Sequence, residues 1–212
     1  MKITEDVYII EALKGKGAYV YVVLDNETTL IDTGMPGSWK KIVKGLVEIG
    51  ISLGQVKHIL LTHSDVDHVG SAAKLQELTG AELWASNEEI PVIIGDEDRK
   101  GFKKYLKYIF HIKKPYHINP LEPGQRINNI EVISIPGHTP GHLCFLYRDV
   151  LFAGDLLKNR KGSLIPYPKL WNWDNTLMMK SVSNVSRIPF KLVCPGHGEP
   201  IEKGIQLESH KD

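Results

Sequence analysis

The chain has 212 residues, enough for one sizeable domain or at most two small ones. Its 26 Lys and Arg residues against 25 Asp and Glu residues argue against a generic nucleic-acid coat or an acidic disordered tail. The amino terminus lacks the cationic and apolar layout of a signal peptide, and no apolar run is long enough to span a bilayer. We therefore expect a cytoplasmic protein with no membrane partner, and the two cysteines, too few for a disulfide framework, fit a reducing compartment.

The amino-terminal part carries three β-rich runs, Val7 to Ile10, Ala18 to Leu24 and Thr28 to Ile31. The polar residues from Asp25 to Glu27 fit a hairpin turn between the second and third runs. This pattern predicts an antiparallel meander. Asp32 follows the third run, where it either closes a turn or orients a histidine from behind.

An α/β pattern follows the meander. Apolar residues recur at helical spacing from Ser38 to Ile49, and Gly50 then ends the predicted helix. The run Val56 to Leu61 predicts a strand. A second helical pattern, 72–78, ends at Gly80, and 81–85 predicts a short strand.

Two histidines and two carboxylates lie within six positions between the strand Val56 to Leu61 and the second helical pattern. They are His63, Asp65, Asp67 and His68. Imidazole and carboxylate groups are ligands of first-row metals, and this spacing lets alternate side chains point the same way. The cluster therefore predicts a metal site on a strand-to-helix loop. The alternative is a polar loop in which an aspartate caps the next helix.

Residues 87–120 form a basic segment that we interpret as a lid or insertion. Phe102, Tyr105, Leu106 and Ile109 lie at helical spacing among lysines, which predicts an amphipathic helix with an apolar stripe. Three interpretations stay open for this helix: an active-site lid, a contact in a homodimer, or a solvated surface helix.

The rest of the chain predicts a second sheet and one more helix. The expected strands and helix occupy Ile130 to Ile135, Leu143 to Tyr147, Val150 to Ala153, Asn175 to Ile188 (the helix) and Lys191 to Cys194. Between them, 156–174 is rich in Pro, Tyr and Trp and is expected to be a loop that walls a substrate site.

Three glycine-containing strand ends offer further ligands: His138 in Ile135–His142, Asp155 in Phe152–Asp155, and His197 in Val193–Gly198. With the cluster at 63–68, this ordered set resembles the metallo-β-lactamase superfamily over essentially the whole chain. The resemblance implies an α/β fold, a four-layer αββα sandwich, in a single domain of residues 1–212. The usual family motif is His-x-His-x-Asp-His, and Asp65 here replaces the second histidine.

The resemblance also implies two divalent metal ions. It places one on His63, Asp65 and His138, and the other on Asp67, His68 and His197, with Asp155 bridging. Zinc is the expected metal, although the oxygen of Asp65 favours iron or manganese more than a third imidazole would. In the family only the first histidine of the 138–142 motif binds metal, so His142 is not expected to. Cys194 is interpreted as the buried end of a strand.

These ligands imply hydrolysis of an ester, thioester or lactone of a small-molecule substrate by a metal-bridging hydroxide. Asp67 is expected to take and return a proton. Alternatives are an iron-dependent oxidoreductase or sulfur dioxygenase of the same superfamily, a phosphodiesterase or nuclease, and a non-catalytic metal-binding protein. A nucleic-acid substrate is not expected. Nor is glyoxalase II, which has a helical carboxy-terminal domain, whereas this chain ends shortly after Gly198.

Overall fold

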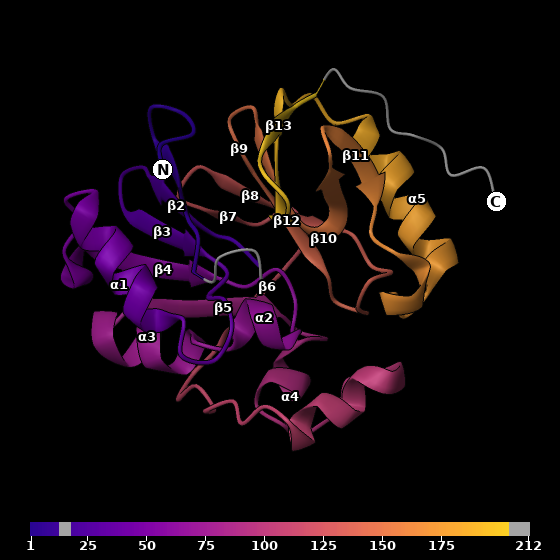
Figure 1. The fold of residues 1–212 in the computed structure, drawn as a ribbon, viewed down its shortest axis with the longest axis horizontal. Coiled ribbons are helices and arrows are strands. Elements are labelled where there is room, and N and C mark those ends of the chain that lie inside the picture. The colour runs from indigo at the N-terminus through magenta and orange to yellow at the C-terminus, as the bar shows by residue number, and fades with distance from the viewer. Residues whose placement is uncertain (13–17, 204–212) are drawn as a thin grey trace. The chain divides into compact units, whose positions relative to one another are not determined.

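The computed structural model describes residues 1–12 and 18–203. The chain divides into two compact units, Met1–Glu122 and Pro123–Asp212, and each holds one of the two sheets, whose strands are labelled in Figure 1 where there is room. No helix in the described ranges is both long enough and apolar enough to cross a membrane. The expectation of a single domain stays a prediction, as does the cytoplasmic location.

The sheet of the first unit is antiparallel at one side and parallel at the other. Its described strands follow the order β1 (Val7–Ile10), β2 (Val20–Leu24), β3 (Thr28–Ile31), β4 (Val56–Leu60), β5 (Glu82–Ser86) and β6 (Asn119–Leu121). The first three strands pair antiparallel as the predicted meander, and β3 to β6 pair parallel. Parallel pairing brings the carboxyl ends of β3 and β4 to one edge of the sheet, where Asp32 and the cluster at 63–68 follow.

Helices of the first unit bury one apolar face each against this sheet. They are α1 (Trp39–Glu48), α2 (Val66–Val69), α3 (Ala72–Thr79) and α4 (Ile90–Ile93), with 3-10 turns η1 (Leu53–Gln55) and η2 (Gly101–Tyr108). Ile42 and Leu46 of α1 and Leu75 of α3 are fully buried in one core with the strands. The predicted helix from Ser38 to Ile49 is therefore confirmed to within one residue at each end.

The predicted amphipathic helix in 87–120 is confirmed as a helix, although it is a short 3-10 helix. The segment forms the short helix α4 and the 3-10 helix η2. Phe102 and Tyr105 of the expected apolar stripe are 41% and 58% exposed, whereas Lys103 is 5% exposed. The lysine is inside because a buried carboxylate of the same unit binds its ammonium group, as described below.

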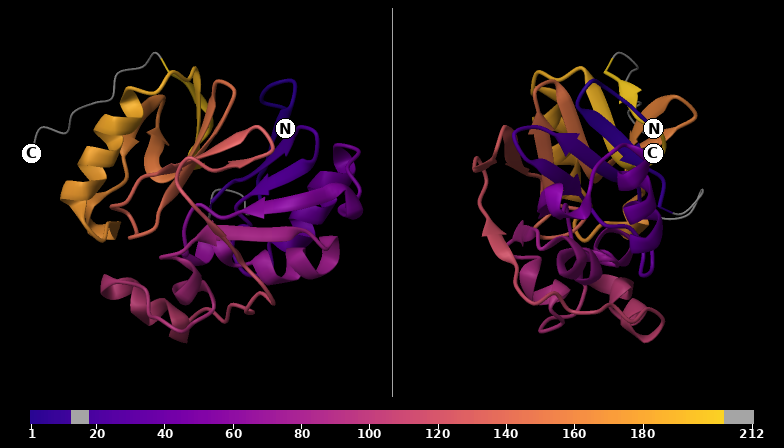
Figure 2. Two further views of the ribbon diagram at one scale, coloured as in Figure 1. Left: turned by 180° about the vertical axis from the view of Figure 1, so that it is seen from behind. Right: turned by 90° about the vertical axis from the view of Figure 1, so that its left-hand side faces the viewer.

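The sheet of the second unit follows the order β13-β12-β10-β9-β8-β7 within the described residues, with β11 paired to β10. Its strands are β7 (Arg126–Ile127), β8 (Ile130–Ser134), β9 (Leu143–Tyr147), β10 (Val150–Arg160), β11 (Ser163–Pro166), β12 (Leu192–His197) and β13 (Ile201–Glu202). Helix α5 (Asn175–Ser186), orange in Figure 2, lies beside the strands of this unit. Its Met178 is buried in the core with residues of β10 and β12. The carboxylate of Asp174 caps the helix by accepting the backbone N–H groups of Thr176 and Leu177.

The prediction of a loop over 156–174 is wrong for 156–166. Strand β10 continues to Arg160 and forms a hairpin with β11, and the 3-10 turn η3 (Lys169–Trp171) follows. Leu156 and Leu157 on one strand and Leu164 on the other are buried, so the hairpin covers part of the core. Asp155 therefore lies within a strand, next to register shifts around Gly154, and not at a strand end.

Gly70, at the end of α2, allows the helix to lie directly against another part of the first unit. A Cβ atom there would lie 2.2 Å from the backbone nitrogen of Pro36. We expect Gly70→Ala to lower the free energy of unfolding by about 1–3 kcal/mol, because the backbone must shift to remove the clash. Urea denaturation measures the effect. Gly54→Ala, where nothing lies within 4 Å of the added carbon, is the control, and equal midpoints for both variants would refute the steric argument.

Candidate metal centre

The cluster at 63–68 spans the turn from β4 into α2. Asp65 is the N-cap of α2, and its backbone carbonyl accepts the N–H groups of His68 and Val69. The side chains of His63, Asp65 and His68 are buried, and that of Asp67 is half-buried in the first turn of the helix. The expected strand-to-helix location is confirmed, except that Asp67 and His68 already belong to the helix.

The carboxylate of Asp32 holds Thr62 and His68 in place by hydrogen bonds. Its Oδ1 accepts the backbone N–H of Thr62 at 2.8 Å, and its Oδ2 accepts the hydroxyl of Thr62 at 2.8 Å. The same Oδ2 lies 2.7 Å from Nδ1 of His68. Because an ionised carboxylate only accepts, we assign the proton of His68 to Nδ1, which leaves the lone pair of Nε2 for a metal.

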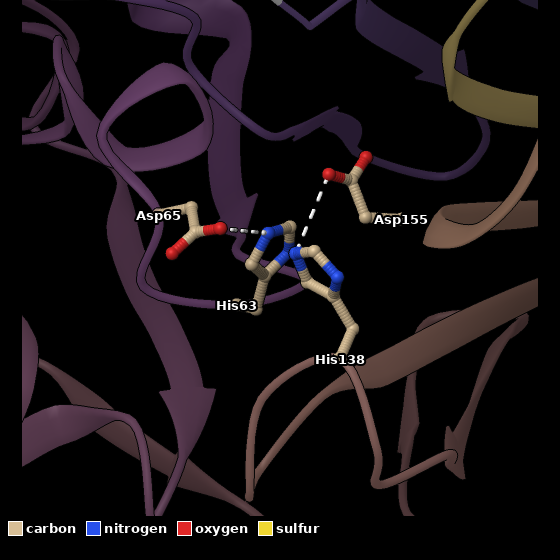
Figure 3. A group of neighbouring side chains, drawn as sticks. All are labelled: His63, Asp65, His138 and Asp155. Carbon is tan, nitrogen blue, oxygen red and sulfur yellow. Dashed lines mark ion pairs between the residues drawn. The ribbon is translucent and has the colours of Figure 1, made fainter. Parts of the chain in front are cut away.

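The same reasoning fixes the tautomer of His63. The only proton of the Thr62 hydroxyl is directed to Asp32, so its Oγ1 accepts from Nδ1 of His63, 3.0 Å away. The lone pair of His63 is then on Nε2, which lies 3.6 Å from Oδ2 of Asp65. A dashed line in Figure 3 marks this pair.

In the second unit, the side-chain amide of Asn172 contacts a histidine Nδ1 atom, as the carboxylate of Asp32 does in the first unit. Nδ1 of His138 lies 3.0 Å from Oδ1 of Asn172. The Nδ2 atom of Asn172 donates to the carbonyl of Tyr167 at 3.2 Å and to Oδ1 of Asn175 at 3.0 Å, which identifies the atom facing His138 as oxygen. His138 therefore also carries its proton on Nδ1 and its lone pair on Nε2.

Asp155 presents each of its oxygens to a different imidazole of the second unit. Its Oδ2 lies 3.4 Å from Nε2 of His138, the second pair marked in Figure 3, and its Oδ1 lies 3.5 Å from Nε2 of His197. The side chain is 2% exposed. A carboxylate arranged in this way can give one oxygen to each of two ions.

Neighbouring residues of the second unit have supporting roles. Nε2 of His142 accepts the backbone N–H of Asp155 at 3.2 Å, so this imidazole positions the aspartate. The ring of Tyr167 packs against His138 and His197, with centroids 4.9 and 5.6 Å away. Burial raises the pKa of the Cys194 thiol, which keeps it protonated and unsuited to binding metal.

Three residues of 87–120 that the sequence analysis did not select also reach the cluster. Oε2 of Glu89 accepts the backbone N–H of Ser64 at 2.8 Å, and the guanidinium of Arg99 donates twice to the carbonyl of Ser64. Lys103 donates to Oδ2 of Asp65. Burial lowers the pKa of Arg99, and the nearby carboxylates, Asp65 first, oppose that shift. No spacing in the sequence links these residues to the cluster, so only the structure reveals them.

The donor sets of both units suit divalent metal ions. Each of the seven predicted ligands offers an imidazole nitrogen or a carboxylate oxygen, and the Nδ1 contacts of His63, His68 and His138 direct Nε2 lone pairs to the ligand role. Hydrogen-bonded imidazoles of this kind are typical of metal ligands.

Comparison with known proteins decides the family, because the profile of the metallo-beta-lactamase superfamily matches residues 13–197. The chain belongs to this superfamily. Among curated relatives, the uncharacterized protein YobT of Bacillus subtilis is 31% identical over 82% of the chain and 80% of its own length. Hydroxyacylglutathione hydrolase GloC of Haemophilus influenzae is 30% identical over 88% and 87%. A probable metallo-hydrolase of B. subtilis, YybB, is 27% identical over 83% and 78%.

Solved structures of the superfamily confirm the predicted fold class. The metallo-beta-lactamase family protein TTHA1429 from Thermus thermophilus aligns with a TM-score of 0.74 over 95% of this chain and 76% of that one, at 22% identity. TTHA1623, solved in a di-iron-bound form, aligns with a TM-score of 0.67 over 95% and 93%, at 26% identity. Superfamily membership and the hydrolase relatives also confirm the prediction of a metal-dependent hydrolase.

Asp32 is the most direct target for testing the hydrogen bonds behind the ligands. We expect Asp32→Asn to weaken metal binding about 10–100-fold, because an amide cannot accept from all three donors. The same change should lower the free energy of unfolding of the metal-free protein by about 1–3 kcal/mol.

A competitive titration with a chromogenic chelator measures the first effect, and urea denaturation measures the second. Asp96→Asn, at an exposed position of the same unit, should change neither. An Asp32→Asn protein with wild-type metal affinity would show that Asp32 only closes the turn.

Proposed function

We propose that the seven predicted ligands bind two divalent metal ions and that the protein hydrolyses an ester, thioester or lactone bond in a small molecule. One ion would take His63, Asp65 and His138, and the other Asp67, His68 and His197, with Asp155 bridging. The observation that carries this proposal is the placement of His138 and His197 on opposite oxygens of Asp155. If Asp155 bound a single ion, both imidazoles would be expected beside the same oxygen, whereas each lies beside a different one.

Charge supports a hydrolytic role for such a site. The three carboxylates offset three of the four positive charges of two divalent cations, and the four imidazoles are neutral. The remaining positive charge favours an additional anion. When bound, two such cations lower the pKa of a shared water towards neutrality and polarise the bond under attack.

The protein residues then hold and move protons around that water. The Nδ1 contacts of His63, His68 and His138 hold the ring protons on Nδ1 and keep the rings correctly turned. Asp67 is half-buried in the first turn of α2, beside the buried His68. We assign to Asp67 the transfer of a proton between the attacking water and the leaving group.

Thioesters are the substrate class with the most support. Two of the relatives are named hydroxyacylglutathione hydrolases, from H. influenzae and Pelagibacter ubique, and their named substrate is a thioester. The match covers 87% of the H. influenzae protein. A missing carboxy-terminal domain is therefore no argument against a substrate of the glyoxalase II type. Thioesters also have good leaving groups, which need little help from a proton donor.

The segment 97–105 is a candidate for substrate recognition in the first unit. Apart from Lys103, its residues line a surface hollow of about 640 Å³, and the exposed rings of Phe102 and Tyr105 lie on it. Small molecules are usually bound in hollows with apolar and aromatic walls and a few polar groups. The homodimer interpretation of this segment stays a prediction.

A second candidate function is an iron-dependent oxidoreductase. It is favoured by Asp65, whose oxygen replaces an imidazole, and by the di-iron-bound form of the similar protein TTHA1623. Metal identity separates the two functions.

Metal content and turnover, measured on the same protein, test this proposal together. Protein expressed without metal supplementation and purified without chelator should contain zinc and hydrolyse S-acyl glutathione thioesters. Elemental analysis and a thiol-release assay measure these properties. A chelator should abolish turnover, and added zinc should restore it. Iron in place of zinc, with oxygen consumption and no thiol release, would replace the hydrolase proposal with the oxidoreductase.

A substitution at Asp67 isolates the role of its carboxylate. We expect Asp67→Asn to lower kcat for thioester hydrolysis about 10²–10⁴-fold, because an amide cannot take the proton of the attacking water. The comparison is made at saturating zinc, with bound metal measured in the same samples. Undiminished turnover at equal metal content would remove the proposed role, and lost metal would make Asp67 a ligand alone.

A further inference from the structure

Lys103 is a buried cation at a carboxylate that we assign to the metal centre. Its Nζ lies 2.5 Å from Oδ2 of Asp65, and the two residues are 5% and 7% exposed. The neighbouring Phe102 and Tyr105 are largely exposed. Burying an ammonium while leaving aromatic rings in water is unfavourable unless the charge has a partner. The pair with Asp65 therefore explains why this side chain turns inward.

The oxygen to which Lys103 donates is the one that faces the neighbouring ligand. Oδ2 of Asp65 lies 3.6 Å from Nε2 of His63. Two atoms bound tetrahedrally to one zinc ion at about 2.1 Å lie about 3.4 Å apart. The spacing of Oδ2 and Nε2 thus suits a shared ion, and the ammonium group occupies the oxygen that such an ion would need.

We propose that the ammonium of Lys103 competes with metal for Asp65, so that the site of His63 and Asp65 fills more weakly than the site of Asp67 and His68. This inference rests on the proposed dinuclear site. A positive charge on the same carboxylate repels an incoming cation, and the ion must displace the ammonium before it reaches Oδ2.

The surrounding contacts allow this exchange without unfolding the segment. Arg99 and Glu89 hold the backbone of Ser64 independently of Lys103. The four-carbon stem of a lysine can rotate away while η2 keeps its place. An alternative role for Lys103 is to hold Asp65 in a ligating orientation. The two roles predict opposite effects when the charge is removed.

The experiment is a zinc titration against a chromogenic chelator on the metal-free full chain. The wild type should bind one zinc ion tightly and a second at least about tenfold more weakly. In Lys103→Met the weaker constant should tighten at least about tenfold, and the tighter one should stay unchanged. Lys104→Met, which removes an exposed charge from the next residue of η2, should leave both constants unchanged.

Amine reactivity gives a second readout that needs no variant. Limited acetylation of the wild type, followed by mass spectrometry, should modify Lys103 several-fold faster in zinc-saturated protein than in metal-free protein. Lys104 is the internal reference. Equal slow acetylation of Lys103 with and without zinc would overturn the proposal.

The outcomes also separate this inference from the proposed function. Two equal zinc constants in the wild type, or a Lys103→Met protein whose weaker constant is unchanged or weakened further, would overturn the competition and leave the dinuclear hydrolase standing. Failure of both the wild type and Lys103→Met to bind any zinc would overturn both.

Discussion

The carboxylate of Asp32 is the constraint on which the ligand cluster of the first unit depends. It can only accept hydrogen bonds, so its contacts determine where the protons of Thr62 and His68 lie. Through the hydroxyl of Thr62 the same constraint reaches His63. One buried charge therefore sets the tautomers of two imidazoles.

The backbone of Asp32 adopts an unfavourable conformation to place this carboxylate. Asp32 has a φ of +60°, which is unusual for a residue with a side chain. Its backbone N–H bonds to the carbonyl of Leu60 at the end of β4, and the next residue, Thr33, donates twice to the carbonyl of His68. The parallel pairing of β3 and β4 thus fixes the turn against α2 and stabilises the strained backbone.

Much of the fold and most of the site could be predicted from local signals. Strands β1 and β3 and helix α5 begin where the sequence indicated, because their patterns of apolar residues and their flanking turn or cap residues lie close together. The ligands could be selected because imidazoles and carboxylates at motif spacing have few other uses. The seven assignments themselves stay predictions.

Other features depend on partners far away in the chain, which local patterns do not reveal. Nothing in the sequence indicates that Lys103 is buried, because its partner, Asp65, precedes it by 38 residues. Asn172 lies among aromatic residues and belongs to no recognisable motif, yet it fixes the tautomer of His138, 34 residues earlier. The hairpin of β10 and β11 contradicts the predicted loop because the Pro and Trp residues near it are typical of loops, whereas its leucines are buried.

The register shifts in β10 determine which changes of length this chain tolerates. The pairing of β10 with β12 is irregular on both sides of Gly154, and Asp155 lies within this irregular stretch. Deleting one residue between Phe152 and Asp155 would change this pairing and shift the carboxylate along the strand, away from the imidazoles that it faces. Deleting one residue in the exposed turn at Lys161 and Gly162 would leave the pairing of β10 with β12 intact. Natural variation in length is therefore expected at the tip of the hairpin and not at its base.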